Sequence, residues 1–498
     1  METLTDNHTE TTAIVGGGAS GLLVAAHLAR SDPRARRILV FEPGPRLGAG
    51  VAFSTDHPRH LLNVPARSMS AFDDAPDDFV DWTGSQGLDY GPNAFVPRGC
   101  YRRYLQEVLA RAQRDASRGS KILWVHDHVE DVLLASSTTD RASIVVRSGA
   151  KYTADSVVFA VGAPRPSVLR SFGLDENAPG VVTDPWRPGA LRDVPVDDAL
   201  IIGTGLTMID VTILLSERAP CATIHARSRT GLMPATHTSG GFANFPALRL
   251  SGETSAREVV RRVHEALVEA DLSGWDWRNV IAALRDFFPP VWGGLPDAEK
   301  KRLLRLLDRR WDVHRHRMSE DVAAQVTALL SSGRLTVRQG RVARVAPTTS
   351  RSVARFDVTI ASARGQEHLQ VGAVIDCSSR SAGGRGGNPL LETLIARGAA
   401  RAHPSGLGLD VGENGALVDV KGSAQAQAYS IGWCRRGQLF ESTAIPELRK
   451  QADQIARAIV EESRTQKRPP TPLHRRVVPT SVMSRGSTPA DVARPVAS

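Results

Sequence analysis

Two stretches of the chain share one pattern of apolar and polar positions. Residues 11–44 begin with TTAIVGGG, and residues 198–229 begin with DALIIGTG. In each, a short β-branched run meets glycines, an apolar segment of helical period follows, and a second apolar run closes the unit. This order is typical of a βαβ unit that binds a nucleotide, so the sequence predicts two such units.

The remaining pattern divides the chain around these two units. It predicts a helix at 101–115, strands at 122–126, 143–148 and 156–162, and a Pro-rich crossing at 163–195. The predicted fold class is α/β: two nested Rossmann-like dinucleotide-binding domains with a helical insert. The predicted boundaries are 1–165 for the first part of the first domain, 195–350 for the second domain with its helical insert at 255–328, 351–463 for the second part of the first domain, and 464–498 for a tail.

Charge and composition change this picture little. Of the formal net charge of +9 over 498 residues, +6 lies in residues 464–498, which hold seven Arg and Lys against Asp491 alone. This Pro-, Ser- and Thr-rich tail is predicted to be disordered, so we expect neither a nucleic-acid nor a membrane partner. Four distant cysteines predict no metal site and no redox-active dithiol. The acidic N-terminus and the lack of a long apolar run favour the cytoplasm.

The first glycine loop has the spacing of a dinucleotide site. Gly16, Gly18 and Gly21 match G-x-G-x-x-G: the first glycine permits the tight turn, the second allows close approach of a pyrophosphate, and the third lets the helix pack on the strand. Glu42 closes the next strand, where a carboxylate accepts from ribose hydroxyls. We expect this loop to hold FAD.

The second loop keeps Gly203 and Gly205 but has Met208 in place of the third glycine. Arg227 and Arg229 stand at the end of its second strand, where an acid would favour NAD and arginine suits the 2′-phosphate of NADP. The alternative is that these arginines are ordinary surface charges. The sequence favours NADPH as a second, visiting dinucleotide.

Six stretches of the chain resemble a known protein family. They are HPRHLLNVPARSMSAFDDAPDDFVDW (57–82), FVPRGCYRRYL, IIGTGLTMID, ARSRTGLMPATH, WDVHRHRM and RRGQLFESTAIPELRKQA. With these stretches, residues 13–458 resemble a bacterial family of FAD/NAD(P)-binding proteins. That family is similar to class B flavoprotein monooxygenases and includes L-aspartate N-monooxygenases that form nitrosuccinate. The N-hydroxylase signature D-x3-[LF]-A-T-G-Y is partly present, since Asp155, Phe159, Ala160 and Gly162 fit but Val161 and Ala163 replace Thr and Tyr, and Ser379 stands where the family usually has glycine.

The resemblance implies an enzyme that uses FAD, NADPH and dioxygen to hydroxylate the amine nitrogen of a small amino acid through a C4a-hydroperoxyflavin. L-Aspartate is the specific expectation. The alternatives are a flavin oxidoreductase or NADPH oxidase without oxygen transfer, and a non-enzymatic flavin redox sensor that uses the basic tail. The oligomeric state stays open.

Candidate site residues follow from residue type and place. Asn63 and Val64 are expected to line the isoalloxazine ring, with Gly162 also in the cofactor site. The Asn63 amide is a candidate catalytic-site group that hydrogen-bonds the flavin or the nicotinamide, and the alternative is that Asn63 caps a loop turn. Arg315 and Arg317 are the candidate catalytic-site clamp for a substrate carboxylate, because guanidinium groups pair bidentately with carboxylates. A solvated helix face or an ion-pair network between domains explains the same pattern. His237 and Arg98 are further candidates, His57 and His60 are expected at the surface, and Glu441 and Glu447 are expected to orient backbone near the flavin.

Overall fold

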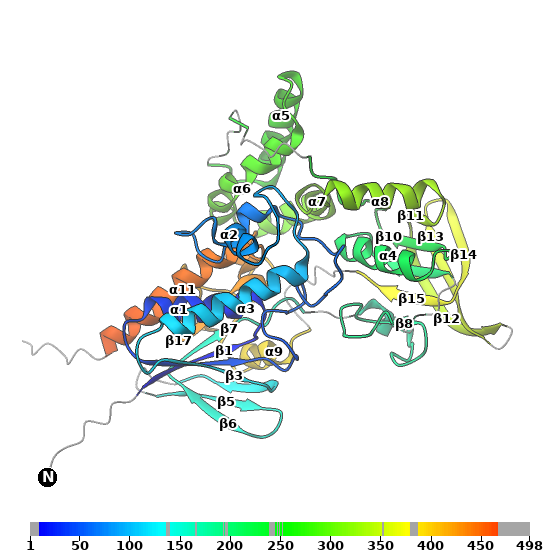
Figure 1. The fold of residues 1–498 in the computed structure, drawn as a ribbon. Helices are drawn as coiled ribbons and strands as arrows, with labels where there is room; N and C mark the ends of the chain where they lie inside the picture. Colours follow the sequence, from blue (N-terminus) through cyan, green and yellow to red (C-terminus); the bar gives the residue numbers. More distant parts are fainter. Residues whose placement is uncertain are drawn as a thin grey trace, which may run out of the picture.

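The structure is a computed structural model. It describes residues 9–135, 140–164, 167–192, 194, 198–238, 245–246, 248, 250, 252–350, 353–378 and 387–466. Two β-sheets lie side by side, with a group of helices above their junction (Figure 1). Each sheet contains one of the two predicted βαβ units, which confirms the α/β class and the nesting of one dinucleotide fold inside the other.

The first sheet has the strand order β16–β17–β7–β1–β2–β3, parallel throughout except for β16. Because successive side chains of a strand point to opposite faces, Ile14 packs with the helices on one face while Ala13 and Val15 pack on the other. Its strands are β1 (Glu10–Val15), β2 (Arg36–Phe41), β3 (Lys121–Val125), β7 (Ser156–Phe159), β16 (Ala416–Val418) and β17 (Ala424–Ser430).

Both faces of the first sheet are covered. Helices α1 (Ala19–Ser31), α3 (Arg98–Asp115) and α11 (Ile445–Gln466) cover one face (Figure 1). A small antiparallel sheet and α9 (Pro389–Ala396) cover the other. The small sheet consists of β4 (Val129–Leu133), β5 (Ala142–Val146) and β6 (Lys151–Ala154). Shorter helices of this half are η1 (Ala66–Ser68), α2 (Asp78–Ser85), η3 (Gly432–Arg435) and α10 (Arg436–Leu439).

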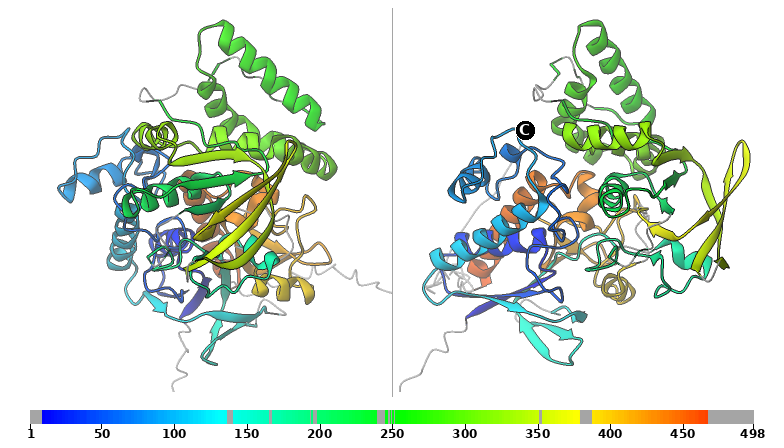
Figure 2. Two further views of the ribbon diagram at one scale, coloured as in Figure 1. Left: turned by 90° about the vertical axis from the view of Figure 1, so that its right-hand side faces the viewer. Right: turned by 45° about the vertical axis from the view of Figure 1, so that its right-hand side comes forward.

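The second sheet is parallel, in the order β11–β10–β9–β15–β8. Helices α4 (Leu206–Arg218) and α8 (Glu320–Ser331) pack on one face, and long antiparallel strands pack on the face away from the first sheet (Figure 2). The sheet consists of β8 (Val181–Val182), β9 (Ala199–Ile202), β10 (Ile224–Ser228), β11 (Leu335–Gln339) and β15 (Ala373–Asp376). The covering strands are β12 (Arg341–Ser350), β13 (Val353–Ser362) and β14 (Gly365–Val371), and η2 (Val168–Phe172) precedes β8.

Three predicted boundaries differ from the structure. The second domain does not end at 350, because β15 pairs with β9 inside the second sheet and extends this unit to Asp376. The insert does not reach 328, because α8 packs in the core of the second sheet. The crossing at 163–195 contributes β8 to that sheet. Helix α11 continues to Gln466, and the predicted disorder of the tail from 467 onward lies outside the described residues, as does Ser379.

The insert is a group of three helices, α5 (Ala256–Leu272), α6 (Trp277–Gly294) and α7 (Asp297–Arg315). Although it belongs to the second unit by sequence, it packs on the last segment of the first unit. The ring of Phe440 lies 4.7 Å from Phe288, 4.9 Å from Trp292 and 5.7 Å from Trp311, measured between ring centroids. The indole N–H of Trp292 also donates to the carbonyl of Gly437 at 2.8 Å.

Phe440 holds an unusual backbone conformation, with φ +59°. A non-glycine residue in this region stores about 1–3 kcal/mol of strain and persists only where surrounding contacts hold it. Here the three aromatic rings of the insert surround a side chain that is 6% exposed. The aromatic cluster (Phe288, Trp292, Trp311 and Phe440) therefore joins the insert to the chain segment just before α11.

A buried ion pair joins the two dinucleotide units directly. Arg98, at the start of α3, lies 2.8 Å from a carboxylate oxygen of Asp210 in α4. His60 lies 3.0 Å from the carbonyl of Asp210 through Nε2, and His57 lies 3.0 Å from Glu217. The expectation of a surface position for His60 is wrong, since its side chain is buried at this junction.

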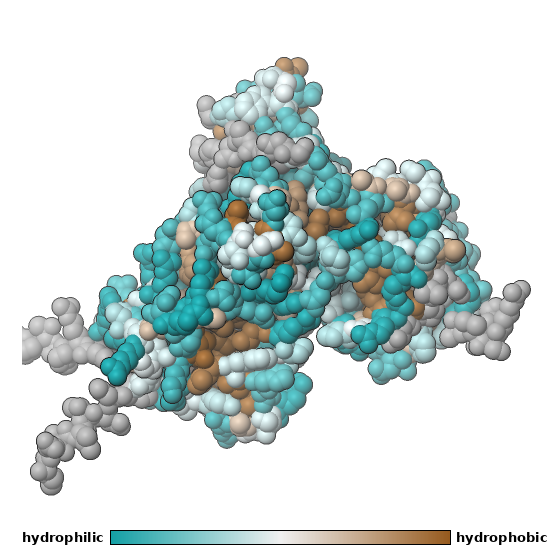
Figure 3. Space-filling model, viewed as in Figure 1, coloured by the Kyte–Doolittle hydropathy of each residue, from teal (hydrophilic) through white to brown (hydrophobic). Residues whose placement is uncertain are grey.

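The surface is mostly hydrophilic, with an apolar area below α3, beside the β3 edge of the first sheet (Figure 3). Leu123 and Trp124 are exposed on this edge strand. Among the described residues, no helix is both long and apolar enough to span a lipid bilayer.

We predict that Phe440→Ala destabilises the protein by about 3–5 kcal/mol, because it removes the ring that fills the aromatic cluster. Urea unfolding measures the loss, and limited proteolysis shows whether the insert is cut first. Leu272→Ala is the matched control, since Leu272 lies in the same insert but is 82% exposed. Equal stability of the two variants would contradict a docking role for Phe440.

The Arg98–Asp210 pair predicts a specific pH effect. Burial raises the pKa of Asp210 to about 6, against the opposing charge of Arg98. The pKa of Asp210 is higher in the folded than in the unfolded protein, so ionising this carboxyl group costs more in the folded state. Its contribution to the free energy of unfolding is therefore present at low pH and is lost as pH rises from about 4 through about 6. Asp210→Asn stays neutral, so its stability relative to the wild type should rise by roughly 1–3 kcal/mol between about pH 4 and about pH 7. Urea unfolding of both proteins at the two pH values tests this, and a relative stability that falls would contradict it.

Candidate active site

The first glycine loop leaves a concave backbone surface, here called the cradle, that any side chain in place of its glycines would fill. Gly16 has φ +108°, and a methyl group there would collide with the carbonyl of Ala160. A methyl group at Gly21 would collide with the carbonyl oxygen of Gly16, and one at Gly18 would lie 3.3 Å from Cα of Gly50. The N-terminus of α1 has no side-chain cap and no acid in its first turn. Bare backbone N–H groups at a helix N-terminus fit a diphosphate.

Glu42 lies beside this cradle and is oriented by it. Its carboxylate accepts from the backbone N–H of Gly17 at 3.0 Å and from that of Gly44 at 2.7 Å. A carboxylate has about four acceptor positions, so two remain for ribose hydroxyls. Gly162 follows β7 with φ +69° and has no atom near its missing side chain, which leaves open space at the end of that strand.

The second glycine loop repeats the geometry at the end of β9. Gly203 has φ +108°, and a methyl group there would collide with the carbonyl of Cys377. Gly205 is the N-cap of α4, which again has no side-chain cap and no acid in its first turn. Met208, in place of the third glycine, is fully buried in the core of the second sheet.

The two arginines after β10 have different surroundings. Arg227 is 1% exposed and pairs with Glu367 of β14 at 2.8 Å, so its guanidinium lies between the second sheet and the strands that cover it. The prediction that Arg227 binds the 2′-phosphate is therefore wrong for the geometry described, because the pair would have to break. Arg229 is exposed, next to Ser228, whose hydroxyl lies 2.9 Å from that of Thr204 in the glycine loop. A contact of Arg229 with the 2′-phosphate stays a prediction.

A cavity of about 390 Å³ connects the second glycine loop to the segment before α11. Its wall includes the first turn of α4, helix α7 of the insert, the end of β15 and residues around Phe440. Ala163, which replaces the signature tyrosine, also lines it. A nucleotide whose diphosphate rests on Gly205 would extend through this space toward the first unit.

Asn63 lies next to a group of positive charges that the fold collects from distant parts of the chain. The Asn63 carbonyl is 3.1 Å from Nε2 of His237. His237 follows a short bridge between Thr236 and Met318, which places it beside Arg317. Burial, together with Arg317 and more weakly Arg278 and Arg315, lowers the pKa of His237 to about 4, so this imidazole is neutral near pH 7. Val64 packs against the core of the first unit.

Two members of the arginine cluster (Arg278, Arg315 and Arg317) lie near carboxylates. Arg278 pairs with Asp276 at 2.8 Å, and Arg315 lies 3.6 Å from Glu441. Burial, with the charges of Arg315 and Arg278, lowers the pKa of Arg317 to about 10. A guanidinium whose charge is disfavoured in this way gains stability from a nearby anion. The site therefore fits a ligand with at least one carboxylate.

Glu441 and Glu447 hydrogen-bond to residues of the insert, whereas the sequence predicted that they orient backbone near the flavin. Glu441 accepts from the Trp311 indole at 2.8 Å, and Glu447 accepts from Arg285 at 2.8 Å. Burial alone would raise the pKa of Glu441, but Arg315 and His316 outweigh it and lower the pKa. Arg315 thus takes part in the ion-pair network between domains, the alternative considered for it. The proposed clamp role then rests mainly on Arg317. Arg98 pairs with Asp210 at the domain junction.

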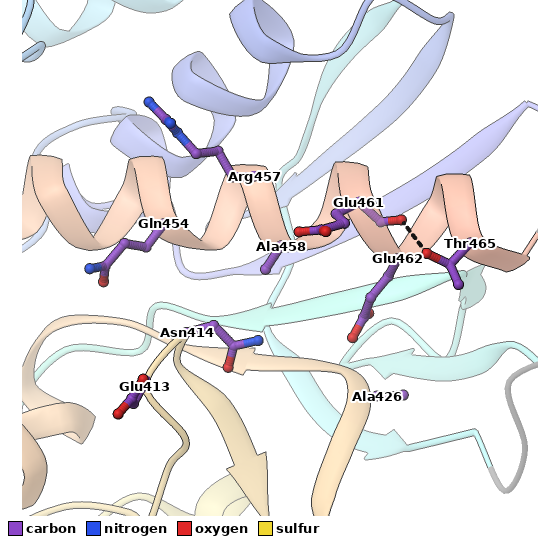
Figure 4. A pocket seen from close by; sticks show the side chains of 9 residues that line it. All are labelled: Glu413, Asn414, Ala426, Gln454, Arg457, Ala458, Glu461, Glu462 and Thr465. Carbon is purple, nitrogen blue, oxygen red and sulfur yellow. Dashed lines mark hydrogen bonds between the residues drawn. The ribbon is translucent and has the colours of Figure 1, made fainter.

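A second, larger depression lies apart from both glycine loops. It is an open groove of about 680 Å³ beside the last turns of α11, where Glu413, Glu461 and Glu462 face it (Figure 4). Acidic side chains there do not suit a phosphate-bearing ligand. We therefore assign neither cofactor to it.

Sequence reasoning missed two arginines. Arg278 of α6 belongs to the arginine cluster, and Arg309 of α7 lies over Gly205. Arg309 lies on a helix with many exposed charges, and Arg278 lies at the start of a mostly apolar helix, so pattern alone separates neither from a surface residue. Their roles depend on how the insert is docked.

Gly16→Ala tests the first cradle. We predict that it loses most of its flavin, because the added methyl group pushes the loop away from Ala160 and from the diphosphate position. Gly149→Ala is a matched control with φ +86° but open space, so it carries only the strain of about 1 kcal/mol that a side chain has at positive φ. Flavin absorbance per protein measures the outcome, and equal flavin content in both variants would contradict this assignment.

Comparisons with known proteins agree with this geometry. A family model described as FAD-NAD(P)-binding matches residues 13–164, which include the first glycine loop, Glu42, Asn63 and Gly162. No curated protein matches the sequence. Among solved structures, ornithine hydroxylase from Pseudomonas aeruginosa is 15% identical with a TM-score of 0.62, over 91% of this chain and 99% of that one.

Two further structures share the whole fold. The ornithine N-hydroxylase of Kutzneria sp. 744, solved with reduced FAD, NADP+ and L-ornithine, is 15% identical with a TM-score of 0.59, over 92% of this chain and 100% of that one. The cadaverine monooxygenase of Erwinia amylovora, bound to FAD, is 12% identical with a TM-score of 0.61, over 97% and 100%. Residues 13–164 thus match an FAD-NAD(P)-binding family model, and the chain has the fold of these ornithine hydroxylases and of the cadaverine monooxygenase.

Proposed function

We propose that this chain is an FAD- and NADPH-dependent monooxygenase that hydroxylates the amine nitrogen of a small amino acid. The substrate proposed is L-aspartate. One hydroxylation, which consumes one O2 and one NADPH, gives N-hydroxyaspartate, and nitrosuccinate as the final product requires three such oxidations of the same nitrogen. The observation that carries the substrate class is the arginine cluster beside the Asn63 loop, in which three guanidinium groups lie close enough to His237 to lower its pKa. The fold shared with ornithine and cadaverine N-hydroxylases supports the reaction class.

The residues of the site fit both cofactors. The Gly16–Gly21 cradle and Glu42 would hold the diphosphate and ribose of FAD, and Gly205 with Arg229 would hold NADPH. FAD reduced by NADPH supplies, together with dioxygen, the oxygen atom that is transferred. The protein's part is to place the substrate nitrogen, to exclude water and to set the charge of the amine.

The arginine cluster performs two of these tasks. Arg317, with Arg278, would bind the substrate carboxylates, since guanidinium forks pair with them bidentately. The same positive potential disfavours the ammonium form of the substrate and so raises the fraction of neutral amine, which is the nucleophile. His237 stays neutral above about pH 4, and its contact with the Asn63 carbonyl joins the second unit to the Asn63 loop of the first.

The aromatic cluster performs the third task. Phe440 and Trp311 line the cavity and also dock the insert on the first unit, so these rings would shield a bound flavin from water. A dry, closed site protects a reactive oxygen donor from loss to water.

The first test is NADPH consumption by the purified protein in air across a panel of amino acids and amines, with hydrogen peroxide measured in parallel. L-Aspartate should accelerate consumption while peroxide stays low, and L-ornithine and cadaverine should not. Substrate-independent consumption that ends entirely as peroxide would contradict the proposal and favour an NADPH oxidase.

Arg317→Gln tests the carboxylate clamp. We predict that it raises KM for L-aspartate by about 10- to 100-fold, the usual effect of losing one charge-assisted pair, while flavin reduction by NADPH is unchanged. Arg317→Lys keeps the charge and should recover part of the loss. Arg302→Gln, at an exposed position of α7, is the control. An unchanged KM in Arg317→Gln would remove this residue from the substrate site.

A further inference from the structure

Helix α7 of the insert reaches the second glycine loop as well as the first unit. A methyl group added at Gly205 would lie 3.6 Å from Nη1 and 3.8 Å from Nη2 of Arg309. No other heavy atom outside its chain neighbours comes within 4 Å of that position. The guanidinium group therefore stands directly over the N-cap of α4, on the open side of the loop.

Two hydrogen bonds fix the orientation of the Arg309 guanidinium group. Its Nη2 donates to the carbonyl of Leu232 at 3.2 Å and to the hydroxyl of Thr204 at 3.4 Å. These two contacts direct the planar group toward Gly205. Arg309 and the first residues of α4, from Gly205 to Thr207, line the same cavity of about 390 Å³.

We propose that Arg309 is a positioning residue for NADPH, which binds the diphosphate of the nucleotide from the side opposite the glycine loop. The proposal rests on the function proposed above. Backbone N–H groups at the start of α4 would contact one side of the diphosphate, and the guanidinium fork of Arg309 would contact the other. The insert then supplies part of the nucleotide site, and NADPH binding depends on the docking of α7.

The position of Arg309 separates its role from that of Arg229. Arg229 follows β10, where the adenosine ribose of a Rossmann unit lies, and would read the 2′-phosphate that only NADPH carries. Arg309 lies at Gly205 and would contact the diphosphate, which NADPH and NADH share. Loss of Arg309 should therefore weaken both nucleotides equally, whereas loss of Arg229 should weaken NADPH alone.

The experiment is the rate of flavin reduction by NADPH and by NADH as a function of nucleotide concentration, measured anaerobically by stopped flow on the FAD-loaded protein. Arg309→Ala should raise the apparent Kd of both nucleotides by the same factor, about 10- to 100-fold, without changing their ratio. Arg229→Ala should change the ratio. Arg310→Ala, the next and exposed residue of α7, should match the wild type.

Several outcomes would overturn the inference. Wild-type affinity in Arg309→Ala excludes a contact with the nucleotide, and a loss confined to NADPH moves the contact to the 2′-phosphate. Arg309→Lys keeps the charge and the stem, so it serves where the alanine variant does not fold and should give a smaller increase in both Kd values. If neither nucleotide reduces the wild-type flavin, the proposed function fails, and this inference fails with it.

Discussion

The packing of Phe440 among Phe288, Trp292 and Trp311 is the contact on which the rest of the structure depends. These rings join two parts of the chain that sequence order assigns to different dinucleotide units. Through this contact α7 comes to lie between the second glycine loop and the segment before α11, with Trp311 and Arg315 toward Glu441 and Arg309 toward Gly205. The strained φ of Phe440 indicates that the local backbone is held by this packing.

Electrostatics in the resulting site follow from the same docking. Arg278 of α6 and Arg317 after α7 approach each other and Asn63 only because the insert covers the first unit. Burial and the charges of Arg315 and Arg278 lower the pKa of Arg317, so an anion next to this guanidinium stabilises its charged form. This charge balance supports the acidic amino acid proposed as the substrate.

The features of the structure that the sequence predicts are local turns, strands and helices. Gly16 and Gly203 adopt positive φ because their turns approach the carbonyls of Ala160 and Cys377, and glycine spacing alone indicates such turns. The buried pair of Arg227 with Glu367 was not predictable, since it depends on β14 lying over the second sheet. The junction around His60 and the place of β15 depend in the same way on contacts between distant segments. Strand and helix periods do not encode such contacts.

The central claim is that one atom of dioxygen is transferred to the nitrogen of a small acidic amino acid. The most direct test is turnover of L-aspartate by the FAD- and NADPH-supplied protein under ¹⁸O₂, with mass spectrometry of the product. The account predicts a product that carries ¹⁸O on nitrogen in proportion to the NADPH consumed. Unlabelled aspartate, with all of the label recovered in hydrogen peroxide, would contradict it.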